Sequence, residues 1–173
     1  TNSVTVHLLA DGTDTGKTIT LDEAGNWTGT FSSLDKYKAD GTAIVYTVKE
    51  DDITNYTSTT TGDATTGFTI TNTNTEKVNI SGTKTWDDNN NQDGKRPSSV
   101  TVKLLADGQD TGKTLELNAA NGWTGSFTDL DADKGGTPIQ YTVVEVTVAG
   151  YTSEITGDAA SGFTITNSYS PET

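Results

Sequence analysis

The chain alternates hydrophobic and polar residues in short runs rich in Val, Thr, Ile and Tyr. Such runs, bounded by turns rich in Gly, Asp and Asn, predict β-strands whose alternate side chains point to opposite faces. No stretch keeps the period of an amphipathic helix. Asn121-Gly122, directly before Trp123, predicts a hairpin turn. The pattern therefore predicts an all-β protein.

Several segments of the first half of the chain recur in the second half. The matching pairs are residues 3–12 and 99–108, 14–18 and 110–114, 27–29 and 123–125, 46–50 and 141–145, and 67–72 and 162–167. Recurrence at this spacing predicts two tandem repeats, residues 1–75 and 76–173, each an immunoglobulin-like β-sandwich. Residues 78–97 have no counterpart in repeat one, so the first repeat is expected to lack its opening strand.

Three strands of repeat two carry a polar residue on an otherwise apolar face. The residues that share a face are Val78, Ile80, Lys84 and Trp86; Ile139, Tyr141, Val143 and Glu145; and Phe163, Ile165, Asn167 and Tyr169. Lys84, Glu145 and Asn167 are therefore expected to point into the sandwich. Burial favours the neutral forms of ionisable groups, and a neutral lysine amine is a nucleophile.

This pattern allows two interpretations. In the first, Lys84 attacks the side-chain amide carbon of Asn167 with Glu145 as the assisting acid, ammonia leaves, and an internal isopeptide bond forms. In the second, Lys84 and Glu145 form a salt bridge while Asn167 caps a strand end. The alternation of residues alone leaves both open.

A resemblance favours the cross-link. The motifs that carry it are residues 82–88, Arg96-Pro97, residues 100–102, residues 141–145, Gly150-Tyr151 and residues 163–167. Together they resemble the Cna-B domain, the B-type repeat of collagen adhesins, over residues 78–169 and, without the first strand, over residues 3–72. The resemblance implies a stalk repeat of a Gram-positive surface adhesin or pilin on an immunoglobulin-like, transthyretin-like sandwich. It also implies that Lys84 and Asn167 are joined with help from Glu145.

Repeat one keeps only part of this set. Glu50 and Asn72 stand at the matching positions, but no lysine precedes them on a matching strand. Lys17 is expected beside a turn and Lys49 is expected to face solvent. We therefore expect an incomplete site with no cross-link inside repeat one, and an open strand edge where another strand could add.

The composition of the chain narrows the range of expected binding partners. The chain has 24 acidic and 11 basic residues and a net charge of -13, which repels nucleic acid and anionic membranes. It has no cysteine, no apolar stretch of the roughly 18 residues of a membrane helix, and no signal peptide at its start. With the resemblance, the expected setting is extracellular and cell-wall-anchored, with the anchor and signal peptide outside these residues. The expected partners are neighbouring repeats of the same surface protein.

The remaining candidate sites are weak. His7, the only histidine, belongs to no repeated constellation. Asn89, Asn91 and Asp93 mimic the start of a calcium loop, but its twelfth position is Val100 rather than glutamate, which favours a solvated loop. We therefore expect no metal, no cofactor and no turnover enzyme.

Two further expectations concern the aromatic residues and the competing function. Trp27, Trp86 and Trp123 are expected to fill the core rather than to form a sugar-binding platform. The competing function is a ligand-binding adhesin domain that recognises host matrix or glycan. It would need long variable loops or an exposed aromatic cluster, whereas the loops here are short and repeated.

Overall fold

The computed structural model describes residues 2–169 of the chain. The chain divides into two compact units, unit 1 over Thr1–Thr75 and unit 2 over Glu76–Thr173. Every described element is a β-strand except one short 3-10 helix, Ala119–Asn121. No helix among residues 2–169 has the length and apolar character needed to cross a membrane. The all-β prediction is confirmed.

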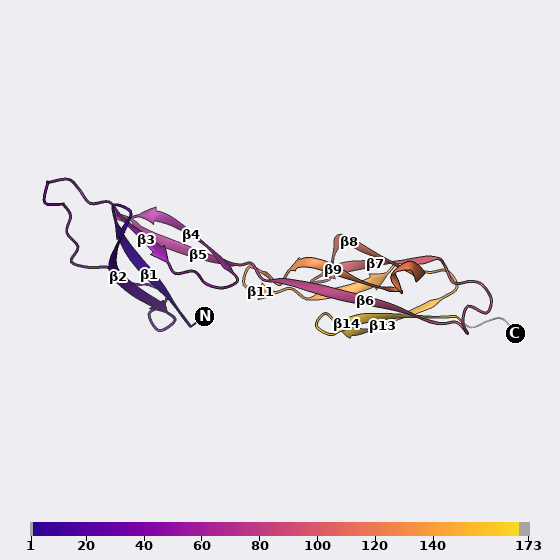
Figure 1. Cartoon of the computed structure of the whole chain (residues 1–173). Coiled ribbons are helices and arrows are strands. Elements are labelled where there is room, and N and C mark those ends of the chain that lie inside the picture. Colours follow the sequence, from indigo (N-terminus) through magenta and orange to yellow (C-terminus); the bar gives the residue numbers. More distant parts are fainter. Residues whose placement is uncertain (1, 170–173) are drawn as a thin grey trace. The chain divides into compact units, whose positions relative to one another are not determined.

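Unit 2 is a sandwich of two sheets (Figure 1). Its strands are β6 (Lys77–Asp87), β7 (Ser99–Ala106), β8 (Gln109–Asn118), β9 (Thr124–Asp131), β10 (Asp133–Lys134), β11 (Thr137–Pro138), β12 (Tyr141–Glu145), β13 (Thr152–Asp158) and β14 (Gly162–Ser168). One sheet has the order β12-β7-β8, the other β13-β14-β6-β9, and β10 pairs with β11 in a small ribbon. The pairing of β6 with β14 is parallel, and the other pairings are antiparallel. The first and last strands of unit 2 are therefore neighbours in the middle of one sheet.

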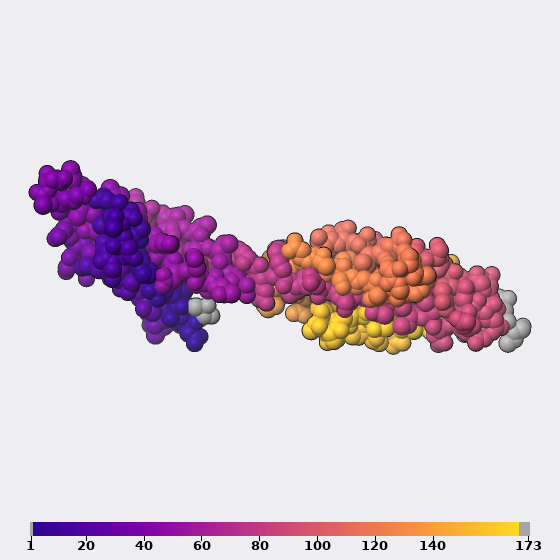
Figure 2. All heavy atoms as spheres, viewed as in Figure 1, coloured from indigo at the N-terminus to yellow at the C-terminus, as the bar shows by residue number. Residues whose placement is uncertain are grey.

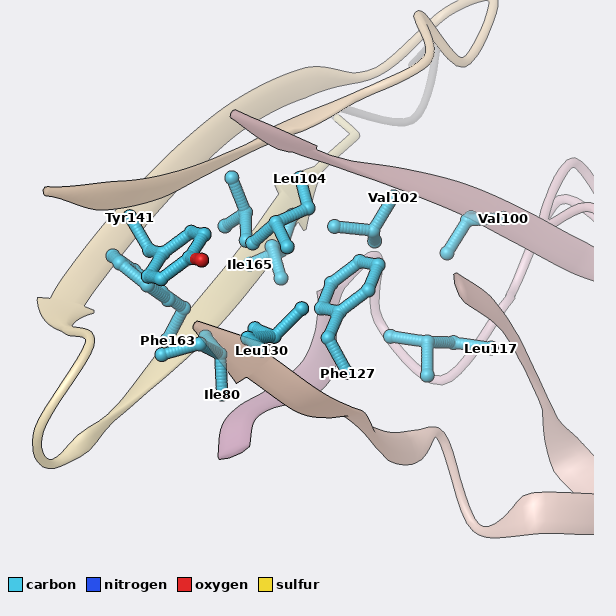
Figure 3. Packing of buried hydrophobic residues seen from close by; sticks show 11 residues of the cluster. Ile80, Val100, Val102, Leu104, Leu117, Phe127, Leu130, Tyr141, Phe163 and Ile165 are labelled. Atoms are coloured by element: carbon cyan, nitrogen blue, oxygen red, sulfur yellow. The ribbon is translucent and has the colours of Figure 1, made fainter. Parts of the chain in front are cut away.

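The core of unit 2 lies between the two sheets. It is made of the inward-facing residues Ile80, Val100, Val102, Leu104, Leu117, Phe127, Leu130, Tyr141, Val143, Phe163 and Ile165. In Figure 3 the side chains of Leu104 from one sheet and Ile165 from the other approach one another. In the space-filling view, the yellow residues of β13 and β14 lie together along one side of this unit (Figure 2). Alternation along each strand therefore builds a single apolar layer.

The turn before Trp123 differs from the predicted hairpin, because β8 and β9 belong to different sheets. The side chain of Asn118 accepts a hydrogen bond from the backbone N–H of Asn121 and caps the 3-10 helix. Gly122 then ends the helix in the left-handed conformation, with φ 67°. The predicted hairpin is therefore wrong: the chain does turn sharply at Asn121-Gly122, but the turn carries it from one sheet to the other.

Unit 1 contains five strands in two sheets. They are β1 (Ser3–Ala10), β2 (Thr13–Asp22), β3 (Tyr46–Glu50), β4 (Tyr56–Asp63) and β5 (Gly67–Asn74). The sheets have the orders β2-β1-β3 and β4-β5. Among residues 2–75 no counterpart of β6 is found, as predicted, and residues 28–35, which match β9 in sequence, form no strand. Within residues 76–169 β9 pairs with β6 alone, so the absence of one strand removes the other.

The same absence uncovers the apolar face of unit 1. Phe31, Leu34, Phe68 and Ile70 are half-buried, whereas their counterparts Phe127, Leu130, Phe163 and Ile165 are buried. Trp27 is 45% exposed, so the expectation that it fills a core is wrong. Its counterpart Trp123 packs against the core of unit 2, as does Trp86. A strand that is missing from the sheet, rather than a change in these residues, explains the difference.

Hydrogen exchange should report this difference. β14 is bonded to a strand on each side, whereas β5 is bonded only to β4. We expect the amides of β5 to exchange at least about 10-fold faster than those of β14, because local opening of a strand with one free edge costs less free energy. Mass spectrometry of peptides covering residues 67–74 and 162–168 makes the comparison. β1 and β7 are each bonded to a strand on both sides, so the ratio of their exchange rates corrects for any difference in overall stability between the units. Equal protection of β5 and β14 after this correction would contradict the prediction.

Candidate functional site

Lys84 lies in the middle of β6 with its side chain fully buried. Its ammonium donates hydrogen bonds to the backbone oxygens of Thr85 (2.9 Å) and Ile165 (3.4 Å). Burial lowers the pKa of Lys84 from 10.5 to about 8, and the nearby carboxylate of Glu145 opposes the shift without cancelling it. The lysine is thus held in a dry environment that disfavours its charge.

Glu145 contacts both of the other residues that the sequence analysis selected. The side-chain nitrogen Nδ2 of Asn167 donates a hydrogen bond to Oε1 of Glu145 at 2.8 Å. The second oxygen, Oε2, lies 3.7 Å from Nζ of Lys84. Asn167 is completely buried, and the Glu145 side chain is 2% exposed. One buried carboxylate therefore lies against an amine and an amide at once.

The strand register explains how Lys84 reaches this place. Lys84 is paired with Ile165 across the parallel β6–β14 ladder, and Asn167 follows two residues later on the same face of β14. Two residues advance a strand by roughly 7 Å, a distance that an extended lysine side chain can span. Glu145 approaches from β12, in the opposite sheet. The three residues meet between the sheets, near the end of β14.

Two oxygens of this cluster lack hydrogen bonds. Oε2 of Glu145 and Oδ1 of Asn167 are buried with no hydrogen-bond partner within the described part of the chain. Leaving a buried acceptor unsatisfied costs roughly 1–3 kcal/mol, so such atoms call for an explanation. A polar network that served only to stabilise the fold would be expected to give both of these oxygens a hydrogen bond.

Aromatic rings cover the amine. Nζ of Lys84 lies 4.0 Å from the ring centroid of Trp86. Trp123 and Tyr151 pack edge-on against Trp86, with centroid distances of 5.3 and 5.1 Å. The attraction of such a ring for an ammonium is about 0.5–2 kcal/mol. The pKa of Lys84 is nevertheless lowered to about 8, chiefly by burial.

Beside Trp86 lies a charged cluster that sequence reasoning missed. The carboxylate of Asp88, 2% exposed as a residue, accepts hydrogen bonds from Nε of Arg96 (3.0 Å) and from the hydroxyl of Tyr151 (2.9 Å). Arg96 holds the pKa of Asp88 down to about 2, and burial together with Asp88 raises the pKa of Tyr151 to about 12. The cluster fixes the start of the loop after β6. Its members belong to no common alternation pattern, so strand parity could not have found it.

Unit 1 carries half of the same arrangement. Nδ2 of Asn72 donates a hydrogen bond to Oε1 of Glu50 at 2.9 Å, and Glu50 is 7% exposed. Lys17 and Lys49 are both exposed and lie on β2 and β3, and Lys49 faces solvent as expected. Within residues 2–169 no group of three or more metal-ligating side chains is present. The structure therefore places the amide and the carboxylate of unit 1 together without an amine between the sheets.

Comparison with known proteins agrees with the fold. The family of the Cna protein B-type domain matches residues 1–73 and again residues 80–168. The chain belongs to this family. Its Cna B-type units therefore belong to a structural, non-enzymatic kind of domain found in surface adhesins.

Three similar proteins or structures come from Staphylococcus aureus. A collagen adhesin of Staphylococcus aureus is 44% identical over 172 residues, which make up 98% of this chain but only 14% of the relative. The crystal structure of a single B repeat unit, B1, of the S. aureus collagen binding surface protein is 42% identical, with a TM-score of 0.53 over 99% of this chain and 89% of that one. A structure of two such units, B1 and B2, is 43% identical, with a TM-score of 0.54 over 100% of this chain and 45% of that one. Units 1 and 2 together therefore correspond to one B repeat unit.

The charged cluster can be tested with a matched pair of tyrosines. Tyr151→Phe removes the hydroxyl that donates to the buried carboxylate of Asp88, and we expect it to lower the free energy of unfolding of unit 2 by about 1.5–3 kcal/mol. Tyr56 is its counterpart in unit 1 and is 41% exposed, so Tyr56→Phe should change stability by less than about 0.5 kcal/mol. Denaturant unfolding of both variants measures the difference. Equal effects of the two substitutions would show that the contact with Asp88 contributes nothing.

Proposed function

We propose that this chain is a stalk repeat of a bacterial cell-surface adhesin or pilin, and that Lys84 and Asn167 of unit 2 become joined by an isopeptide bond. The repeat would lie outside the cell, within a longer polypeptide anchored to the cell wall, and would adjoin further repeats of that polypeptide. The similarity to a collagen binding surface protein supports this setting. The structure of two consecutive B units supports neighbouring repeats as partners.

The observation that carries the proposal is the single carboxylate of Glu145 in contact with both reacting groups. It lies 2.8 Å from the amide nitrogen of Asn167 and 3.7 Å from the amine of Lys84. Polar groups this close in a buried site act on one another far more strongly than in water. A lysine, a carboxyl group and an amide in this arrangement are suited to amide exchange.

The reaction balances without any added reagent. The neutral amine of Lys84 attacks Cγ of Asn167, the new Nζ–Cγ bond forms, and the Cγ–Nδ2 bond breaks. Glu145, when protonated, donates to Oδ1 of Asn167 and polarises the carbonyl, once the amide has turned to face it. The carboxyl group then relays the proton lost by Nζ to Nδ2, which leaves as ammonia. The lowered pKa of Lys84 raises the fraction of amine that can start the reaction.

The bond would join the first and last strands of unit 2. The chain has no cysteine, so no disulfide is available for this purpose. A covalent link between residues 84 and 167 closes a loop of about 80 residues, and a link that closes such a loop stabilises a fold by roughly 4 kcal/mol in the chain-entropy model. Glu145 takes part once, during maturation, so the unit is a structural module and not a turnover enzyme.

Intact mass tests the bond directly. We expect the chain to be lighter than its sequence mass by one ammonia, and Lys84→Ala and Asn167→Ala to have their full masses, because each removes one end of the bond. Lys113→Ala, at an exposed lysine, should keep the deficit. Glu145→Gln should abolish or greatly slow its appearance. A parent chain at full mass would leave the buried ion pair of Lys84 and Glu145 as the correct interpretation and would overturn the proposal.

The proposed bond also predicts a loss of thermal stability. Asn167→Ala should lower the free energy of unfolding of unit 2 by roughly 4 kcal/mol through the lost link alone. Differential scanning calorimetry of this variant, beside Lys113→Ala, measures the change. A melting temperature equal to that of the parent chain would contradict the prediction.

Without the bond, the stability of unit 2 should depend on pH. In Asn167→Ala the Lys84 amine stays free, and its pKa is about 8 in the fold against 10.5 in the unfolded chain. Between these values the unfolded state binds more protons, so the free energy of unfolding should rise by about 2 kcal/mol from about pH 8 to pH 10. The double variant with Lys84→Met lacks this titration and is the control. Parallel curves for the two variants would contradict the assigned burial of the amine.

A further inference from the structure

Trp86 contacts both the Lys84 amine and the charged cluster of Asp88, Arg96 and Tyr151. Nζ of Lys84 lies 4.0 Å from the centroid of the Trp86 ring, and the guanidinium carbon of Arg96 lies 5.2 Å from the same centroid. Two positive groups therefore meet at one ring, although like charges repel each other. Because the guanidinium of an arginine is always charged, the repulsion acts against the ammonium form of Lys84.

No hydrogen bond fixes the Trp86 ring. Its indole nitrogen Nε1 is buried without a hydrogen-bond partner in the described part of the chain. The orientation of the ring therefore depends on its neighbours: Trp123 and Tyr151 pack against it edge-on, and Arg96 lies over it. A guanidinium and an aromatic ring attract each other, so Arg96 helps to hold the ring against the amine.

Arg96 is itself held in place by several hydrogen bonds. Its Nε and Nη2 donate to the two carboxylate oxygens of Asp88, at 3.0 and 2.5 Å. Its backbone N–H donates to Oδ1 of Asn91 at 2.9 Å, and the backbone N–H of Asn91 donates to Asp88 at 2.9 Å. A two-pronged arginine–carboxylate pair fixes orientation as well as distance. The loop from Asp88 to Arg96 thus returns the guanidinium to Trp86.

Charged groups from three parts of unit 2 act on the Lys84 amine. Burial is the largest influence and lowers the pKa of Lys84 to about 8. Of the charged groups, Glu145 on β12 and Asp88 after β6 oppose this shift, whereas Arg96 adds to it. Arg96 acts in two ways, because its charge repels the ammonium and because it pairs with the carboxylate of Asp88, which otherwise stabilises the ammonium.

We propose that Arg96 is a positioning residue for the isopeptide-forming reaction of unit 2. Anchored on Asp88, it holds the Trp86 ring against the amine and adds a fixed positive charge beside it. Only a neutral amine attacks the side-chain carbon of Asn167, so a group that disfavours the ammonium form raises the rate. Arg96 makes and breaks no bond in this reaction. The proposal rests on the proposed function.

The first test measures the amine in a chain that cannot form the bond. In the Asn167→Ala chain the Lys84 amine stays free, and the NMR shift of its Cε follows its titration. Adding Arg96→Met should move the midpoint to higher pH by about 0.5–1 unit, because the repelling charge is lost. Lys95→Met removes an exposed positive charge from the neighbouring residue and should leave the midpoint unchanged.

Two further variants of the Asn167→Ala chain keep the test decisive if Arg96→Met fails to fold. Arg96→Lys keeps a positive charge beside Asp88 and should retain most of the lowered midpoint. The double variant Arg96→Met with Asp88→Asn leaves no unpaired buried charge. Its midpoint should lie between those of the unsubstituted site and of Arg96→Met, since it also removes the opposing influence of Asp88.

The second test measures the reaction in the full chain with Asn167 intact. Chain from a short cell-free synthesis is transferred to buffers of different pH, and the loss of ammonia is followed by intact mass. We expect Arg96→Met to lose ammonia about 3- to 10-fold more slowly than Lys95→Met at pH 7. The two rates should approach each other near pH 10, where the amine is mostly neutral in both variants.

Three outcomes would overturn the role of Arg96. The first is a Lys84 midpoint that Arg96→Met leaves unchanged, and the second is an equal shift in Lys95→Met. The third is a rate ratio that is the same at every pH, because a general loss of packing would then explain the slower reaction. If the parent chain loses ammonia normally, these outcomes leave the proposed function standing. A parent chain that never loses ammonia would overturn the proposed function, and the role of Arg96 in the reaction with it.

Discussion

The parallel pairing of β6 with β14 is the constraint on which the rest of unit 2 depends. These are the first and last strands of the unit, so the whole intervening chain serves as the crossover connection that parallel strands need. Their register sets Lys84 beside Ile165 and one same-face position before Asn167. β9 then pairs with the other edge of β6, and the opposite sheet brings Glu145 over the pair. The contact among Lys84, Glu145 and Asn167 is thus a consequence of strand order rather than of any local loop.

Comparing unit 1 with unit 2 shows which features of the fold depend on neighbouring residues and which depend on distant strands. Its residues repeat those of unit 2 closely, and the left-handed backbone of Trp27 matches that of Trp123, so the preceding turn sets this conformation locally. The hydrogen bond between Asn72 and Glu50 also forms without help from a β6 strand. The burial of the apolar side chains, by contrast, depends on a distant strand. Without a middle strand the β9-like segment forms no ladder, and its apolar side chains stay partly in water.

Much of the fold and of the candidate site could be predicted from the sequence, because alternate side chains of a strand point to the same face. Parity alone pointed Lys84, Glu145 and Asn167 inward, and internal repetition revealed the missing opening strand. The turn at Asn121-Gly122 was misassigned, since a turn signal does not reveal whether the flanking strands share a sheet. The exposure of Trp27 was missed because burial depends on what covers a residue, not only on its type. The cluster of Asp88, Arg96 and Tyr151 joins positions up to 63 residues apart and follows no period.

The parallel arrangement of the terminal strands has a mechanical consequence. The chain enters β6 at Lys77, ahead of the first ladder pair Gly82–Phe163, and leaves β14 at Ser168, which pairs with Asp87 at the other end of that ladder. Tension between these two points slides β6 and β14 lengthwise past each other, so their ladder bonds are strained together in shear rather than opened one after another as in a zipper. A domain loaded in this way resists rupture through many bonds at once, even before any covalent tie is considered.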